Sequence, residues 1–274
     1  MSWRFTVLGC GSSPGVPRIN GDWGACDPGN PKNRRRRCSL LVERIGAGGV
    51  TTVLIDTSPD MREQMLMAGV TRIDGVLFTH PHADHVHGID DLRQYALIQR
   101  QLIETYANAH TLERLNAAFG YCYEQPAGSV YPPILRANEI RAGEILRVEG
   151  PGGAIEALPI DQVHGPIRSL GFRFGGDLEE RRGGLCYSPD ISGIPDESVD
   201  SLRDLDVWIV DALQYRMHLS HFSLGQSLEW IERLAPKRGV LTHMHIPLDY
   251  ATVQLETPDH VEPAYDGMVI ELEG

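Results

Sequence analysis

Four potential metal ligands lie within six residues of the sequence, at positions 80 to 85. His80 and His82 are two residues apart, Asp84 and His85 follow directly, and His87 comes two positions later. In a locally extended segment, residues two apart point the same way, so His80 and His82 can reach one ion at the roughly 2.0–2.1 Å of a zinc–nitrogen bond. Asp84 and His85, at the start of the next turn, can reach a second ion. The spacing predicts a metal site rather than a polar loop.

Two ions need more ligands than this short segment offers, so more distant side chains must complete the site. His164, Asp190 and His243 each follow an apolar run or its turn, and the ends of neighbouring strands meet at one edge of a sheet. A carboxylate can bridge two ions, and Asp190 is the candidate for this position. Two ions about 3.5–4 Å apart with open positions are used for in-line hydrolysis, because they activate a water and clamp the leaving oxygen.

Short apolar, β-branched runs bounded by turn residues recur along the chain and predict strands. A helix over 223–234 is predicted to begin with Ser223 as N-cap and Gln226 completing a capping box. Strands mixed with helices predict a layered α/β (α+β) fold whose helices cover sheet faces. No linker-like stretch divides residues 1–274, which are expected to form a single domain. The predicted strands are 5–9, 39–43, 51–57, 75–79, 154–160, 169–174, 184–188, 207–212, 239–243 and 268–273; the other predicted helices are 59–68, about 89–100 and 111–119.

The composition limits the partners and the compartment. The chain carries 37 acidic and 25 basic side chains, a formal net charge of −12, which argues against nucleic acid as a partner unless a basic patch overrides it. One such patch, 32–37, is more often a solvated loop than a phosphate site. Five scattered cysteines without a C-x-x-C pair fit a reducing cytoplasm. Neither a secretion signal nor a membrane span is expected, and the oligomeric state stays open, with a homodimer among the candidates.

The run THPHADH resembles the H-x-H-x-D-H motif of the metallo-β-lactamase-fold hydrolases, and the later ligand candidates come in the order that this superfamily uses. The resemblance implies an αβ/βα sandwich, in which two mixed β-sheets are flanked by helices and a dinuclear centre lies at one edge. It also implies the ligand sets: His80, His82 and His164 for the first ion, Asp84, His85 and His243 for the second, and Asp190 as the bridge.

Longer stretches resemble the phosphodiesterases that open phosphoribosyl 1,2-cyclic phosphate, a group related to the tRNA 3′-processing endonucleases. This resemblance implies hydrolysis of a small cyclic or nucleotide-like phosphodiester by a metal-bridging hydroxide. The mixed histidine and carboxylate ligands suit Mn²⁺, Zn²⁺ or Fe²⁺. The motif alone is shared with glyoxalase-type thioesterases and lactonases, whereas flavodiiron oxidoreductases have a glutamate at the position of His82. The stretches are 8–18, 27–43, 84–93, 220–231 and 263–272.

His221 lies just before the predicted helix 223–234 and can project toward the site as a general acid or as a donor to a phosphoryl oxygen. His218 competes for this role, and the resemblance favours His221. Asp84, Asp190 and His221 are therefore the expected catalytic residues. His87 is expected to be structural or to support the ligands from outside the metal site.

Other polar residues are expected to orient the ligands, because a ligating imidazole usually donates its second N–H to an acceptor. Asp90, Asp91 and Arg93 follow the histidine motif closely, and Asp56 and Asp211 end predicted strands. The basic residues 34–37 are a weaker candidate for a phosphate contact.

Some relatives carry a C-x-C-x-x-C loop that holds a structural zinc together with a histidine near the last metal ligand. Here only Cys26 remains, with Gly21 and Trp23 at the other two positions. No structural zinc is therefore expected at the Cys26 loop, and His245 is expected to pack against Cys26.

Two alternatives to a phosphodiesterase remain open. A tRNA 3′-processing endonuclease needs an inserted tRNA-gripping arm and a basic surface, and the charge of −12 supports neither. A non-catalytic nucleotide- or metal-binding protein is the second, and the complete set of ligands argues against it.

Overall fold

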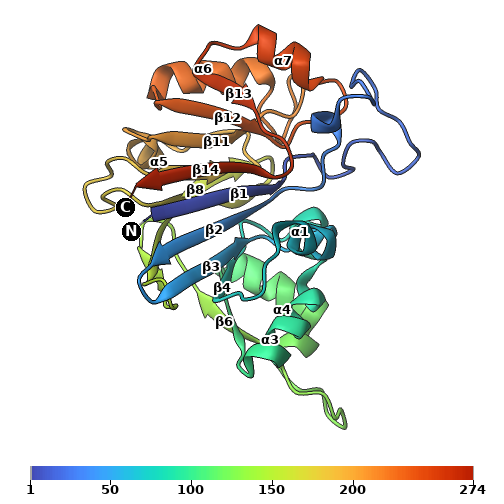
Figure 1. Ribbon diagram of the computed structural model, residues 1–274, viewed down its shortest axis with the longest axis vertical. Coiled ribbons are helices and arrows are strands. Elements are labelled where there is room, and N and C mark those ends of the chain that lie inside the picture. Colours follow the sequence, from blue (N-terminus) through green and yellow to red (C-terminus); the bar gives the residue numbers. More distant parts are fainter. Residues whose placement is uncertain (1, 274) are drawn as a thin grey trace.

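Two seven-stranded sheets lie face to face, with helices on their outer sides (Figure 1). The computed structural model describes residues 2–273; the terminal residues 1 and 274, which belong to the predicted domain, lie outside the described residues. The predicted αβ/βα sandwich is confirmed.

The first sheet has the strand order β14-β1-β2-β3-β4-β5-β6. Its β1, β2, β3 and β14 pair antiparallel, whereas β3 to β6 run parallel. Ser2 pairs with Glu273, so the two ends of the chain lie side by side (Figure 1). The strands are β1 (Ser2–Gly9), β2 (Ser39–Gly46), β3 (Gly49–Ile55), β4 (Gly75–Leu77), β5 (Ile103–Ala107), β6 (Leu135–Glu139) and β14 (Met268–Glu273).

The second sheet has the order β13-β12-β11-β10-β9-β8-β7. Its β7 to β10 pair antiparallel, and β10 to β13 run parallel. The strands are β7 (Leu146–Val148), β8 (Ile155–His164), β9 (Ile167–Phe174), β10 (Leu185–Ser188), β11 (Val207–Asp211), β12 (Arg238–Thr242) and β13 (Val261–Pro263).

The helices fall into two groups along the chain. In Figure 1, α1, α3 and α4 lie beside the first sheet, and α6 and α7 lie beside the second. The capping box of α6 is confirmed, because the Ser223 side chain accepts from the Gln226 backbone and the Gln226 side chain accepts from the Ser223 backbone. The predicted helix 89–100 is a 3-10 turn, Ile89–Leu92, followed by α3. The helices are α1 (Met61–Ala68), α2 (Ala83–Val86), α3 (Arg93–Gln99), α4 (Ala109–Tyr123), α5 (Asp196–Val199), α6 (Leu224–Leu234) and α7 (Tyr250–Glu256).

The main hydrophobic core joins the inner faces of the two sheets. Phe5 and Val53 of the first sheet belong to the same buried cluster as Phe172 and Trp208 of the second. Burying a large apolar side chain contributes about 1.5–3 kcal/mol. Since this core holds the sheets together, it also fixes the relative positions of their strand ends.

The described part of the chain, residues 2–273, has no helix that is both long and apolar enough to cross a membrane. All five cysteines are buried with free thiols.

Candidate metal centre

Three histidines from two segments bring ring nitrogens together at one point. His82 Nδ1 lies 2.9 Å from His80 Nε2 and 3.1 Å from His164 Nε2. His80 follows β4 in the first sheet, and His164 ends β8 in the second. A tetrahedral zinc ion with nitrogen ligands at 2.0–2.1 Å spaces those nitrogens about 3.3 Å apart. The spacing of this histidine trio suits one ion.

A second trio of ligand atoms comes from Asp84, His85 and His243. Asp84 Oδ2 lies 3.4 Å from His85 Nε2 and 3.8 Å from His243 Nε2. Asp84 and His85 lie in α2, which begins directly after His82, and His243 follows β12. The three ligand atoms lie within 4.8 Å of one another, a spacing that also suits one ion.

Asp190 lies between the two trios, two residues after β10. Its Oδ2 is 3.0 Å from His85 Nε2, and its Oδ1 is 3.3 Å from His243 Nε2 and 3.8 Å from His164 Nε2. The buried carboxylate thus faces ligand atoms of both trios. The sequence candidates His80, His82, Asp84, His85, His164, Asp190 and His243 are all brought together.

Several of these atoms are buried without a hydrogen-bond partner. Within residues 2–273, His85 Nε2, His243 Nε2 and Asp190 Oδ2 have none. A buried unsatisfied polar group costs about 1–3 kcal/mol. Three such atoms converging on one space favour an occupant that accepts electron pairs, and divalent cations fit this donor set.

Electrostatics support the same fit. Burial lowers the pKa of His80 well below its ordinary value and that of His164 to about 4, so both are the neutral imidazoles that metals bind. Burial also works to lower the pKa of His85, but Asp190, Asp56 and Asp84 raise it well above its ordinary value. The carboxylates attract positive charge to this position, and a metal cation can supply it in place of the proton.

Asp56, directly after β3, orients two of the histidines. Its Oδ2 accepts from His85 Nδ1 at 2.7 Å and from Thr79 Oγ1 at 2.8 Å, and its Oδ1 accepts from the Thr79 backbone N–H at 2.8 Å. The Thr79 hydroxyl in turn accepts from His80 Nδ1 at 2.9 Å. Both rings therefore carry the proton on Nδ1 and leave Nε2 for a metal.

Two residues at the site adopt left-handed backbone conformations although they are not glycine. Asp56 has φ 63° and His243 has φ 57°. This region costs a residue with a Cβ roughly 1–2 kcal/mol. Such strain is kept where the surrounding structure requires it, typically at functional sites.

His221 lies beside the second trio. Its Nδ1 donates to Asp211 Oδ2 at 2.8 Å and lies 3.8 Å from Asp190 Oδ1. Its ring stacks on His243 with centroids 4.6 Å apart and lies edge-on to His164 at 4.7 Å. The competing candidate, His218, is exposed, with its Nδ1 accepting from the Ser220 backbone. The structure therefore brings His221 rather than His218 to the ligands.

The prediction that Asp90, Asp91 and Arg93 orient the histidines is wrong. Asp90 pairs with Arg93 at the surface, and Asp91 is exposed. His87 is also exposed, and its ring packs edge-on against Phe119 with centroids 5.8 Å apart. The 3-10 turn after α2 carries these side chains away from the ligands.

The prediction that His245 packs against Cys26 is also wrong. Cys26 Sγ donates to the backbone carbonyls of Ile246 and Leu248, each at 3.4 Å, whereas His245 contacts Ser12 and Arg18. The clusters of three or more potential ligands found within residues 2–273 do not include Cys26. The absence of a structural zinc stays a prediction.

The basic residues 34–37 have separate environments. Arg34 is exposed. Arg35 is buried and donates to Asn33 and Cys26. Arg36 pairs with Asp266, and Arg37 pairs with Asp60. Of these four arginines, only Arg37 lines the cleft beside Asp84.

One orienting contact has no signal in the sequence. His164 Nδ1 donates to the backbone carbonyl of Ser220 at 2.6 Å. Any residue type offers a carbonyl, so only the fold identifies this partner.

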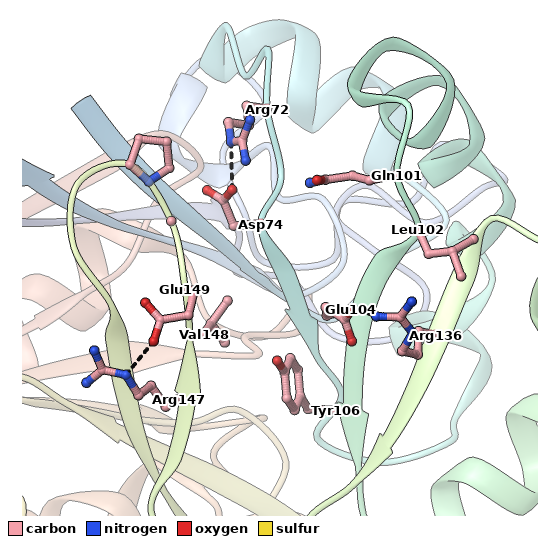
Figure 2. A pocket seen from close by; sticks show the side chains of 12 residues that line it. Arg72, Asp74, Gln101, Leu102, Glu104, Tyr106, Arg136, Arg147, Val148 and Glu149 are labelled. Carbon is pink, nitrogen blue, oxygen red and sulfur yellow. Dashed lines mark hydrogen bonds and ion pairs between the residues drawn. The ribbon is translucent and has the colours of Figure 1, made fainter. Parts of the chain in front are cut away.

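A separate cavity of about 640 Å³ lies at the opposite ends of the strands (Figure 2). Its lining residues Asp74 and Leu102 precede β4 and β5, whereas the metal-ligand candidates follow the carboxyl end of β4. Its charged groups pair with one another, as Arg72 with Asp74 and Arg147 with Glu149, both at 2.6 Å (Figure 2). We assign no chemistry to this charge-balanced cavity.

The fold and the histidine-rich strand ends define a metallo-β-lactamase-fold hydrolase. Residues 51–244 match the beta-lactamase superfamily domain. A diphosphatase from the PhnP family is 32% identical, with 99% of this chain and 98% of that chain covered and a TM-score of 0.85. The chain therefore belongs to the beta-lactamase superfamily and, within it, to the PhnP family.

Two further proteins resemble this chain less completely, one over half of its own length and one in fold only. An octanoyltransferase of Porphyromonas gingivalis is 30% identical over 270 residues, which are 97% of this chain but 51% of that protein. The chain thus spans about half the length of this relative. The short form of human tRNase Z is 17% identical with a TM-score of 0.64, over 97% of this chain and 98% of that one. The similarity to human tRNase Z shows a shared fold only.

Proposed function

We propose that the chain is a dinuclear metal-dependent phosphodiesterase that hydrolyses a small cyclic or nucleotide-like phosphodiester. The observation that carries the proposal is the pair of ligand trios with Asp190 between them at one edge of the sandwich. The related diphosphatase, at 32% identity, supports a phosphate-containing substrate.

The roles of the ligands follow from their grouping. His80, His82 and His164 would hold one ion, Asp84, His85 and His243 the other, and Asp190 would contact both. When bound, such ions act as Lewis acids and activate water for in-line attack on phosphorus. Asp56 and the Ser220 carbonyl hold the rings of His85 and His164 in the required tautomers.

His221 serves in this proposal, in the form that carries a proton on both ring nitrogens, as the proton donor to the leaving oxygen. Asp211 accepts the hydrogen bond from Nδ1 and so fixes the ring, which leaves the Nε2 proton for the leaving oxygen. The stacking on His243 prevents the ring from turning away. A donor in this position stabilises charge on the leaving group as the phosphorus–oxygen bond breaks.

We also propose that residues 1–274 act as one domain, because both sheets contribute ligands to one site. A reducing compartment such as the cytoplasm suits the five free thiols.

The test is a substrate panel on protein loaded separately with Mn²⁺, Zn²⁺ or Fe²⁺, with metal content measured in parallel. The panel holds phosphoribosyl 1,2-cyclic phosphate, linear nucleotide diesters, diphosphates and phosphomonoesters. His80→Ala and Asp190→Ala should lose bound metal and diesterase activity, whereas His110→Ala, which removes an exposed histidine of α4, should lose neither. Full activity of the first two variants after metal stripping and reconstitution would refute the mechanism.

The same panel separates the alternatives. Cleavage of pre-tRNA without cleavage of small diesters would favour a tRNA 3′-processing endonuclease, a function that the charge of −12 does not favour. Tight binding of nucleotides without turnover would favour a non-catalytic binding protein.

A further inference from the structure

The segment between β11 and α6 exposes large apolar side chains beside the candidate metal centre. Residues 215–219 are five consecutive exposed residues. Met217 is 78% exposed and Leu219 is 94% exposed, and neither belongs to a buried apolar cluster within residues 2–273. Apolar side chains left in water lose the stabilisation that burial provides, and neighbouring ones commonly mark a contact site. The fold itself gives these two side chains no partner.

The exposed segment is fixed to the body of the protein at its base and near its middle. At the base, the Leu213 backbone N–H donates to the Phe222 carbonyl at 3.0 Å. Tyr215 Oη donates to Glu256 Oε2 of α7 at 2.7 Å. A segment held in this way loses little further freedom when a ligand binds, which favours binding.

Leu219 lies close to two functional groups of the site. His221 is only two residues further on, so the two Cα atoms are at most about 7 Å apart. The next residue, Ser220, accepts the His164 Nδ1 hydrogen bond on its carbonyl at 2.6 Å. A Cβ placed on Gly165 would lie 3.7 Å from the Leu219 carbonyl oxygen. Leu219 therefore adjoins both the expected proton donor and the turn after a metal-ligand candidate.

Met217 is placed by its neighbour His218. The His218 ring lies 5.3 Å from the His221 ring, measured between centroids. Its Nδ1 accepts from the Ser220 backbone N–H at 3.3 Å. Met217 and Leu219 flank His218 in the sequence, so both border the site on the side of His221. We call these two side chains the apolar rim.

We propose that the apolar rim, Met217 and Leu219, binds an apolar leaving group of the substrate. This inference rests on the proposed function, in which His221 gives its proton to the leaving oxygen. The leaving group must lie beside the proton donor, and the apolar rim borders that donor. The substrate class is thereby narrowed to phosphodiesters whose leaving alcohol carries an apolar or aromatic surface.

The benzyl ester of ribose 5-phosphate tests the proposal, because it can break at either of two phosphorus–oxygen bonds to a primary alcohol. Water supplies the oxygen that joins phosphorus, and the leaving alcohol takes up a proton. Cleavage of one bond gives benzyl alcohol and ribose 5-phosphate, and cleavage of the other gives ribose and benzyl phosphate. Chromatography on metal-loaded protein measures the ratio of the two outcomes. This ratio is independent of the fraction of enzyme that is folded and active.

The apolar rim predicts which bond breaks. The wild type should favour release of benzyl alcohol by about 10- to 100-fold, the gain from covering about 100 Å² of the phenyl ring. Met217→Ser and Leu219→Ser should each lower the ratio by about 3- to 10-fold, whereas Met217→Leu should keep it. Leu97→Ser removes an exposed apolar side chain of α3, away from the site, and should leave the ratio unchanged. With the methyl ester of ribose 5-phosphate, which lacks the ring, none of these variants should change the ratio.

Two results would overturn the apolar rim while leaving the phosphodiesterase proposal intact. The first is predominant release of ribose by the wild type, which would place the benzyl group away from His221. The second is an unchanged ratio in the double variant Met217→Ser, Leu219→Ser. That result would assign the two side chains to a surface outside the reaction, such as a contact with a second copy of the chain.

Binding decides the matter if neither bond breaks, an outcome that counts against the proposed function. Calorimetry on metal-loaded protein then compares the benzyl ester with the methyl ester of ribose 5-phosphate. The apolar rim predicts tighter binding of the benzyl ester to the wild type, and loss of that difference in the double variant. Equal binding of both esters to the wild type overturns it.

Discussion

Replacing Asp56 with asparagine should weaken metal binding at the Asp84, His85 and His243 trio without disturbing the backbone. Asp56 has φ 63°, and asparagine is among the few residues that enter this region readily. The substitution also preserves the side-chain volume in a fully buried position. What changes is the hydrogen bonding to His85 and Thr79.

Both orientations of the new amide are unfavourable. If its NH₂ faces His85, at the 2.7 Å now occupied by a carboxylate oxygen, His85 Nδ1 must become an acceptor. The proton then moves to Nε2, the atom that would bind the metal. If its oxygen faces His85, the NH₂ opposes the Thr79 backbone N–H, now 2.8 Å from Asp56 Oδ1. A buried mismatch costs about 1–3 kcal/mol, so affinity at this trio should fall by about 10- to 100-fold.

Calorimetric metal titration of the metal-free protein, with metal content confirmed by mass spectrometry, measures the two affinities. The loss should be larger at the Asp84 trio than at the histidine trio, which Asp56 reaches only through the Thr79 hydroxyl. Asp91→Asn makes the same chemical change at an exposed position and should change neither affinity. Unchanged affinity at both sites in Asp56→Asn would refute the tautomer argument.

Three further outcomes are expected. His221→Asn should lower kcat by about 10²–10⁴-fold for diesters with alkyl leaving groups and much less for p-nitrophenyl esters, at unchanged metal content; equal losses would contradict a proton donor. Removing metal with a chelator should lower the melting temperature, since free metal at 100 times Kd stabilises by about 2.7 kcal/mol; an unchanged calorimetric transition would count against the site. Burial raises the pKa of the Asp266 carboxyl to about 6 in the folded protein. The protonated carboxyl therefore stabilises the folded state at low pH, and this stabilisation is lost as the pH rises through about 6. Asp266→Asn should therefore gain about 3 kcal/mol relative to wild type between pH 3 and 7, and a pH-independent difference in urea unfolding would show otherwise.

Within residues 2–273, the sequence predicts ten of the fourteen strands and misses β5, β6, β7 and β13. β3 contains the apolar run 53–55 and β11 the apolar run 207–210, and both strands are found. β6, with the sequence LRANE, buries one residue fully and exposes most of the rest, so it lacks an apolar pattern. β13 has three residues, too few for any periodicity. β6, β7 and β13 are edge strands, where pairing with one neighbour rather than burial determines the conformation. β5, with the sequence IETYA, lies inside the first sheet and alternates buried and half-buried residues.

The ligands were predictable because their chemistry is in their side chains, whereas their orientation depends on the fold. Asp56 and Asp211 could be proposed as supports because each ends an apolar strand. Asp90 and Asp91 had the same side chain near the motif, but the helical turns after His85 direct them to the surface. Proximity along the chain therefore proved a weaker guide than position at a strand end.

Each sheet contributes one buried carboxylate that orients a histidine of the site. Asp56 follows β3 in the first sheet and binds His85, and Asp211 ends β11 in the second and binds His221. The ligand candidates also come from both sheets. The four candidates between residues 80 and 85 follow β4 of the first sheet, whereas His164, Asp190 and His243 end or follow strands of the second sheet. Each of the two proposed ligand trios combines residues that follow β4 with one histidine from the second sheet. The ligand spacing therefore depends on the packing between the sheets, and metal binding and core stability should strengthen each other.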